Sequence, residues 1–380
     1  MRSTRTSTVR RFGIGVTALA LILSSACAAK VNDAGAGSSS SAAAAASTSA
    51  AATTAAATSA AATSAAAGGD TSAAASSSAA TSAAAPATTA KILPVTGTCS
   101  TPINLAMNDW VGYTADAAVI TYVLQNDLKC RVNQKALAEQ LAWQGLPTGQ
   151  IDVIIENWGH ADLTKKYITD QKTAIDAGPT GNLGQIGWYV TPATLKMFPD
   201  ITNWENLNKY ASKFATSESG SQGQLLDGDP SFVTNDAALV KNLKLNYKVV
   251  YAGSEAALIQ AFRTSEQNNT PVLGYFYSPQ WFLSEVPLTK INLPKYTDGC
   301  DADIQKVACD YPNYTLNKIM SSKLANSGSP AAALIKNFNW TNDDQNLVAK
   351  YITADKMTPE AAAKKWIDAN PDKVKAWLGK

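Results

Sequence analysis

Residues 151–158 read Ile-Asp-Val-Ile-Ile-Glu-Asn-Trp, a short apolar run of strand character that ends at a tryptophan and a turn glycine. The same pattern occurs in residues 103–110, Ile-Asn-Leu-Ala-Met-Asn-Asp-Trp, and in residues 272–281, Val-Leu-Gly-Tyr-Phe-Tyr-Ser-Pro-Gln-Trp. Ligands of open α/β sheets bind at the carboxyl ends of the strands. Aromatic side chains repeated at these ends therefore predict a recognition site lined by three indole rings, those of Trp110, Trp158 and Trp281.

Strand patterns alternate with helical patterns along the rest of residues 91–380, which indicates parallel βαβ units and an α/β fold. In the first cycle we expect strands at 103–108, 131–133 and 152–155 and helices at 115–128 and 134–143. In the second cycle we expect extended segments at 184–191, 248–251 and 270–277 and helices at 192–197, 204–214, 236–243 and 254–268. The remainder reads as helical, over 314–324, 329–338, 341–352 and 359–378.

A folded region of this length is near the practical limit of a single core, so two lobes are expected. We place the two crossings between the lobes at the extended segments 184–191 and 270–278. Lobe 1 then covers about 100–186 and 278–380, and lobe 2 covers about 187–277. A lobe interrupted by another in this way leaves a ligand cleft that can close by hinge bending. This is the two-lobed periplasmic-binding-protein fold, of the type II kind, found in extracytoplasmic solute receptors.

The charges of the folded region almost cancel. The first 90 residues hold five basic and two acidic side chains, which leaves 27 basic and 28 acidic residues of the 32 and 30 in the whole chain. A near-neutral domain lacks the basic surface that nucleic acid requires, so nucleic acid is not an expected partner.

The N-terminus reads as an export signal followed by a tether. Residues 1–27 combine a basic start with a short apolar core, and Leu23-Ser24-Ser25-Ala26-Cys27 resembles a lipoprotein cleavage box, with Ser24 at a position that is usually leucine. We expect Cys27 to carry a lipid that anchors the protein to the outer face of a bacterial cell membrane; an ordinary cut after Ala28 is the alternative. Residues 28–90 are nearly all Ala, Ser, Thr and Gly, and cannot form a packed core.

Four further cysteines, an even number, suit an oxidising compartment. Three pairings are open, and short loops favour Cys300 with Cys309 and Cys99 with Cys130. Zinc binding is the rival interpretation, but the chain has no Cys-x-x-Cys pair and His160 is its only histidine. We therefore expect no metal.

Several stretches together resemble one family, the substrate-binding proteins of ABC importers for glycine betaine, choline and proline betaine. They cover almost all of residues 100–380 and are Asp109-Trp110-Val111-Gly112-Tyr113-Thr114, Gly149 to Trp158, Gly187-Trp188-Tyr189-Val190, Tyr277-Ser278-Pro279-Gln280-Trp281, and Trp366 to Leu378. The resemblance implies an aromatic box that holds a quaternary ammonium group. Its partners would be an ABC permease and the ATPase subunit, and the protein is expected to act as a monomer.

Carried over to this chain, the resemblance places the three indoles in the box. Trp188 or Tyr189 adds a further wall, but adjacent strand residues point to opposite faces, so only one should line the cleft. Independently, indole faces attract a cation that cannot donate hydrogen bonds. The helix start after Trp110, with Gly112 and Tyr113, offers backbone N–H groups for a ligand carboxylate. Asp109 and Asn157 beside the box complete the expected binding residues, and the acidic Asp109 and Glu156 favour a purely cationic ligand.

Other classes of function remain open at this point. The sequence carries no nucleophile elbow, phosphate loop or histidine pair, so we do not expect an enzyme and infer no cofactor. A carboxylate pair such as Asp152 and Glu156 is conceivable, since both lie on one face of a strand. The alternatives to a quaternary ammonium receptor are a receptor for another small molecule and a wall-tethered interaction module without a transport role.

Overall fold

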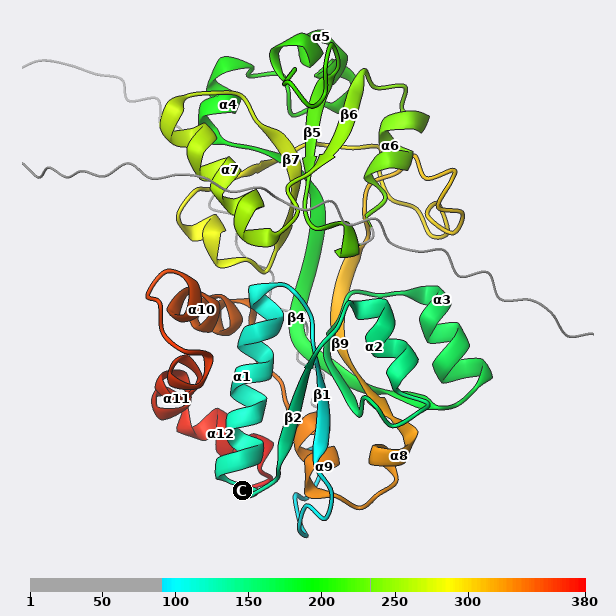
Figure 1. Ribbon diagram of the computed structural model, residues 1–380, viewed down its shortest axis with the longest axis vertical. Helices are drawn as coiled ribbons and strands as arrows, with labels where there is room; N and C mark the ends of the chain where they lie inside the picture. The colour runs from blue at the N-terminus through cyan, green and yellow to red at the C-terminus, as the bar shows by residue number, and fades with distance from the viewer. Residues whose placement is uncertain (1–90, 233) are drawn as a thin grey trace, which may run out of the picture. The chain divides into compact units, whose positions relative to one another are not determined.

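The computed structural model describes residues 91–232 and 234–380, shown in Figure 1. The export signal, Cys27 and the tether at 28–90 lie outside the described residues. Within the described part of the chain, no helix has both the length and the apolar character needed to cross a membrane.

The strands of the described residues form one mixed sheet in the order β2-β1-β3-β9-β4-β7-β5-β6, with β8 paired to β4. Parallel pairs join β1 to β2 and β3 and join β5 to β6 and β7, whereas β4 and β9 run antiparallel to their neighbours. The strands are β1 Ile103–Met107, β2 Val132–Ala136, β3 Val153–Asn157, β4 Ala174–Val190, β5 Gly223–Asp227, β6 Tyr247–Tyr251, β7 Leu273–Ser278, β8 Thr289–Lys290 and β9 Asn313–Ser321.

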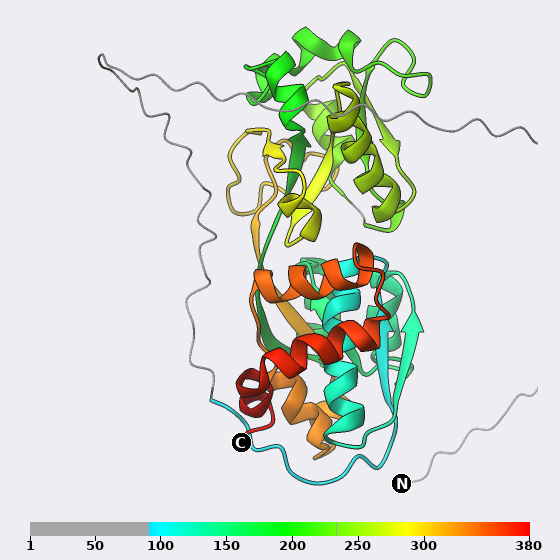
Figure 2. The same cartoon turned by 90° about the vertical axis from the view of Figure 1, so that its left-hand side faces the viewer.

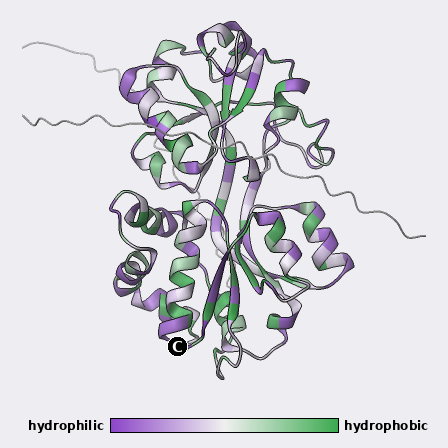
Figure 3. Cartoon of the chain, in the orientation of Figure 1, coloured by the Kyte–Doolittle hydropathy of each residue, from purple (hydrophilic) through white to green (hydrophobic). Residues whose placement is uncertain are grey.

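The helices cover both faces of this sheet. They are α1 Val111–Asn126, α2 Glu139–Gly145, α3 Ala161–Leu163, α4 Pro192–Met197, α5 Leu207–Tyr210, α6 Asp236–Asn242, α7 Glu255–Asn268, α8 Ser322–Ala325, α9 Pro330–Asn337, α10 Asn342–Thr353, α11 Pro359–Ala369 and α12 Pro371–Trp377. Most residues of α1 are buried, because α10 and α11 pack over it on the side away from the sheet (Figure 2). Accordingly, Figure 3 shows apolar residues along α1 and the strands and many hydrophilic ones on α10 and α11.

The fold is the predicted α/β fold with two lobes, connected through β4 and β9 (Figure 1). The first lobe contains β1, β2, β3, β9, the start of β4 and the helices α1–α3 and α8–α12. The second contains β5–β8, the end of β4 and α4–α7. The long strand β4 belongs to both, because its residues 174–185 pair with β9 and its residues 185–190 pair with β7.

The return crossing lies later in the chain than we expected at 270–278. β7 remains in the second lobe, where β4 and β5 hold it on both sides. The chain then stays on that lobe, since Lys290 pairs with Tyr189 and the Asn242 amide donates to the carbonyls of Gln305 and Val307. The strand that returns to the first lobe is β9.

The expected helix over 314–324 is wrong, because β9 occupies most of it. The strand fills the gap between β3 and β4 and pairs with both, and long-range pairing of this kind overrides local propensity. Two other helices are interrupted: 204–214 divides into short turns around α5, and Pro371 separates α11 from α12. β5 lay outside the expected elements altogether.

Two disulfides join Cys99 to Cys130 and Cys300 to Cys309. This is the pairing that loop length favoured. The first ties the segment before β1 to the loop before β2, and the second closes a short loop of the second lobe.

Candidate functional site

Trp110 and Trp158 meet at the carboxyl ends of two strands of the first lobe. β1 and β3 are parallel neighbours, so the residues that follow them lie at the same edge of the sheet. Both indole N–H groups donate to one oxygen, Oε1 of Glu156, each at 2.7 Å. The two indole nitrogens therefore lie no farther apart than twice that distance. The structure thus brings together two of the three predicted tryptophans.

The second lobe presents three further rings to this pair. The Trp110 ring meets Phe232 edge to face with 6.1 Å between centroids, and Trp158 meets Tyr277 in the same way at 5.7 Å. Tyr275 connects the two contacts, at 6.3 Å from Phe232 and 6.0 Å from Tyr277. These five rings and the Glu156 carboxylate, which joins the two indoles, form a closed chain of contacts. We call Trp110, Trp158, Phe232, Tyr275 and Tyr277 the aromatic cycle.

Local sequence explains how the rings reach these positions. Tyr275 and Tyr277 are two residues apart on β7 and so point to the same face of the sheet. Trp158 lies against Gly184 of β4, where an added Cβ would come within 2.6 Å of the indole Cζ3 atom. Gly228 has the same relation to Phe232, since an added Cβ would lie 2.8 Å from the phenyl ring. Glycine at these two positions permits the close approach.

Buried carboxylates surround the aromatic cycle. Glu156 and Asp116 are both fully buried, and the Gln345 amide donates to Oε2 of Glu156 and, at 3.3 Å, to Oδ2 of Asp116. Burial raises the pKa of Asp116 well above its usual value, and repulsion from Glu156 raises it further. Ionisation of Asp116 is therefore disfavoured in this region.

A third carboxylate, that of Glu255, joins the two lobes. Glu255 is the first residue of α7, and its Oε2 accepts the backbone N–H of Val111, the first residue of α1, at 2.9 Å. Its Oε1 accepts the Gln280 amide at 2.9 Å and the Tyr277 hydroxyl. Burial raises the pKa of Glu255, and these hydrogen bonds offset part of the rise.

Within the part of the chain that the structure describes, direct ion pairs are missing around these acids, although the buried Lys318 lies near enough to Asp116 to lower the pKa of that carboxyl slightly. Among the described residues, none of the ion pairs includes Asp116, Glu156 or Glu255. Buried carboxylates in proteins are normally paired with a cation, because an isolated buried charge is costly. The arrangement is suited to accept a cation from outside the chain.

Trp281, the third predicted tryptophan, lies outside the aromatic cycle. It begins a 3-10 turn, Trp281–Ser284, directly after Gln280, and its ring meets Phe282 edge to face. Its indole N–H is buried and has no partner among the described residues. Trp281 therefore directly follows Gln280, which donates a hydrogen bond to Glu255, but its ring does not contact Trp110 or Trp158.

The structure separates Trp188 from Tyr189, as alternation requires. Trp188 lies opposite Tyr275 across the β4–β7 pair, is fully buried and donates its indole N–H to Asp236. Tyr189 points the other way and packs edge to face on Phe276. Trp188 is thus on the face of the sheet that carries Tyr275, in a layer that is closed to solvent.

The remaining predicted residues have varied roles. Tyr113 is fully buried against Trp110, and its hydroxyl accepts the Ile155 N–H on β3. Gly112 leaves room for the Gln345 amide, which an added Cβ would approach to 2.8 Å. Asp109 is exposed. Asn157 is buried, and its amide donates to Asn317 of β9.

Sequence reasoning missed Phe232, Tyr275, Tyr277, Glu255 and Gln345. The alternation Tyr275-Phe276-Tyr277 was a usable signal, because it places two phenol rings on one face beside Trp281. Phe232 follows β5, a strand that was not expected from the sequence. For Glu255, an acidic residue in the first turn of a helix is ordinarily explained by the helix dipole, so its sequence position carries no binding signal.

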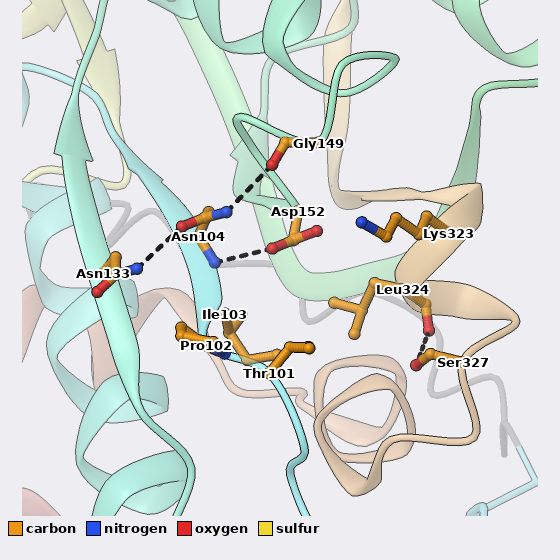
Figure 4. Close-up of a pocket in the computed structure, with 10 residues that line it drawn as sticks. All are labelled: Thr101, Pro102, Ile103, Asn104, Asn133, Gly149, Asp152, Lys323, Leu324 and Ser327. Carbon is orange, nitrogen blue, oxygen red and sulfur yellow. Dashed lines mark hydrogen bonds between the residues drawn. The ribbon is translucent and has the colours of Figure 1, made fainter.

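A separate pocket of about 250 Å³ lies at the opposite edge of the first-lobe sheet. Figure 4 shows Asn104 within it, bonded to Asp152, Gly149 and Asn133. It is lined by the residues that begin β1 and precede β3, whereas Trp110 and Trp158 follow the other ends of these strands. Asp152 therefore lies far along β3 from Glu156, and the two do not form a catalytic pair.

Comparisons with known proteins agree with this architecture. Residues 101–369 match the family described as the substrate binding domain of ABC-type glycine betaine transport systems. A trimethylamine N-oxide-binding protein of Pelagibacter ubique (strain HTCC1062) is 25% identical over 282 residues, which are 71% of this chain and 88% of that protein.

Two solved structures show the same fold. Lactococcal OpuAC, in its closed conformation with glycine betaine, aligns over 73% of this chain and 99% of its own, with a TM-score of 0.58 and 22% identity. An ABC-transporter choline-binding protein in complex with choline aligns over 73% of this chain and 91% of its own, with a TM-score of 0.60 and 17% identity. At these identities the likeness establishes the two-lobed fold.

Proposed function

This chain belongs to the family of substrate-binding domains of ABC-type glycine betaine transport systems, and from that premise we propose that it captures a quaternary ammonium compound and delivers it to a membrane permease. Candidate ligands are glycine betaine, choline and proline betaine. Trimethylamine N-oxide is a further candidate, because the relative from Pelagibacter ubique is a trimethylamine N-oxide-binding protein. The members of this family are receptors, so the protein's task is selective binding.

The observation that carries the proposal is the aromatic cycle with its unpaired carboxylates. A cation within about 6 Å of a ring centroid is attracted to the ring face, and neighbouring rings of the cycle lie about that far apart, so one cation could be attracted to several of them. Each desolvated contact contributes up to about 2 kcal/mol. Glu156 orients both indoles through their N–H groups and adds its charge.

The division of the cycle between the lobes links binding to closure. Trp110 and Trp158 belong to the first lobe, and Phe232, Tyr275 and Tyr277 belong to the second. A ligand that contacts both sets binds the closed arrangement better than an open one and so shifts the population toward it. The connections at β4 and β9 are where the hinge would lie, and the closed form would dock on the permease, whose ATPase supplies the energy.

Residues outside the cycle keep secondary roles in this proposal. Trp281 would form an outer wall, since its indole N–H is unpaired among the described residues and its neighbour Gln280 contacts Glu255. Gly112 and Tyr113 shape the start of α1. Asp109, which is exposed, would contribute only long-range attraction, and Asn157 would fix the turn that carries Trp158.

The place of action follows from the family and from the N-terminal sequence. We propose that the protein works outside the cytoplasmic membrane as a monomer, held by a lipid on Cys27.

A calorimetric titration tests the function. The purified protein is titrated with choline, glycine betaine, proline betaine, carnitine and trimethylamine N-oxide, with proline as the control that lacks a methylated nitrogen. We expect saturable binding of at least one methylated compound, with a micromolar or smaller Kd, and none of proline. If none of the methylated compounds binds, the proposal is refuted, and an interaction module or a receptor for another solute is favoured.

A further inference from the structure

The N-terminus of α1 already holds a carboxylate, and that carboxylate belongs to the protein. Backbone N–H groups at the start of a 16-residue helix form a favourable site for an anion. Here Glu255 reaches across from the second lobe to accept the Val111 N–H. Glu255 also accepts the hydroxyl of Tyr277, a member of the aromatic cycle, so it occupies a helix start beside the cycle that would otherwise suit the acid group of a betaine.

Five further donors around the cycle are also directed at the protein's own acids. Both indole N–H groups of the cycle go to Glu156, as does the Gln345 amide. The Tyr277 hydroxyl and the Gln280 amide go to Glu255. A ligand carboxylate would find these donors already engaged and would face two buried carboxylates, and like charges placed together oppose binding strongly.

We infer that the natural ligand is a methylated ammonium compound that carries no carboxylate, and that Glu255 is the residue that sets this specificity. The inference rests on the proposed function, because it concerns the same site. It separates choline and trimethylamine N-oxide, which have no acid group, from glycine betaine, proline betaine and carnitine, which have one. Choline, which carries a net positive charge, is the best probe.

The wild-type protein gives the first test. The carboxylates of Glu156 and Glu255 should repel the carboxylate of glycine betaine by several kcal/mol. Because 1.4 kcal/mol corresponds to a tenfold change in Kd, we expect choline to bind at least about 100-fold more tightly than glycine betaine. Equal or tighter binding of glycine betaine would overturn the inference and leave the proposed function intact. Binding of no methylated compound would instead refute the function itself.

Variants of Glu255 give the second test. In Glu255→Gln the shape is kept and the charge is lost, so the choline-to-glycine betaine preference should shrink at least about tenfold. Glu255→Ala frees the Val111 N–H as well, and glycine betaine should then bind more tightly than it does to the wild type. An unchanged preference in both variants would contradict the assigned role.

The matched control is Glu266→Gln. Glu266 lies on the same helix and also accepts a backbone N–H at a helix start, that of Ala193 at 2.9 Å, but entirely within the second lobe. Its substitution should leave the preference unchanged. Thermal unfolding of all three variants separates a loss of specificity from a loss of folding. If a Glu255 variant does not fold, the preference of the wild-type protein for choline over glycine betaine still tests the inference.

Discussion

Trp158→Ala removes a ring of the aromatic cycle that contacts both lobes. The indole meets Tyr277 of the second lobe and Tyr314 of β9, both with 5.7 Å between centroids, and donates to Glu156. Loss of one desolvated cation–π contact, about 2 kcal/mol, corresponds to about a 30-fold weaker Kd. Glu156 keeps the Trp110 and Gln345 donors, so its carboxylate is not left without partners.

The assay is isothermal titration calorimetry with the methylated compound that the wild type binds best, accompanied by thermal unfolding. Trp204→Ala is the matched control, because Trp204 is also a half-buried tryptophan but lies in the second lobe at the start of a 3-10 turn. We expect both variants to lose similar stability and only Trp158→Ala to lose affinity. A Kd within about twofold of the wild-type value in Trp158→Ala would refute the aromatic cycle as the binding site.

Three further predictions follow from glycine packing and from buried charges. In Gly184→Ala the new Cβ would lie 2.6 Å from the Trp158 ring, so the indole must shift; we expect at least about tenfold weaker binding and about 1–3 kcal/mol of destabilisation, and an unchanged titration would show that the ring position is not critical. Burial raises the pKa of Asp116 and of Glu255, and a bound cation favours their ionised forms, so affinity should fall as the pH is lowered through the pKa values of the free protein. Calorimetry in buffers of different ionisation enthalpy should then record proton release in the acidic range, whereas a binding enthalpy independent of the buffer would contradict this. Burial lowers the pKa of Lys318 to about 7, so between that pH and the ordinary lysine value the unfolded chain binds more protons and the free energy of unfolding rises with pH. Denaturant unfolding at pH 7 and 9 should show this rise in the wild type and a smaller one in Lys318→Met. An equal change in the free energy of unfolding between the two pH values in both proteins would disprove the role of Lys318.

The sequence was sufficient for β1 and β3 of the first lobe and for their functional ends. Ile103–Met107 and Val153–Asn157 are apolar runs that stop at tryptophans, and a parallel arrangement of such strands places Trp110 and Trp158 together without further information. Helices with clear periodicity, such as 192–197 and 254–268, also agree with α4 and α7 to within one residue.

The second lobe's part of the site was not predictable in the same way. Tyr275 and Tyr277 reach Trp158 only because β7 lies between β4 and β5, and Phe232 reaches Trp110 only because β5 exists. The crossing β9 is a strand because β3 and β4 leave an open gap for it. Glu255 acquires its role by contact with Val111, 144 positions away in the sequence, and no local pattern signals a contact of that kind.

A crystal structure of the protein with choline is the most direct test of the aromatic cycle as the binding site. We expect the ammonium nitrogen to lie within about 6 Å of the ring centroids of Trp110 and Trp158 and of the second-lobe rings of the cycle, with Glu255 still bonded to Val111. Choline bound elsewhere, for example in the pocket beside Asn104 and Lys323, would contradict it.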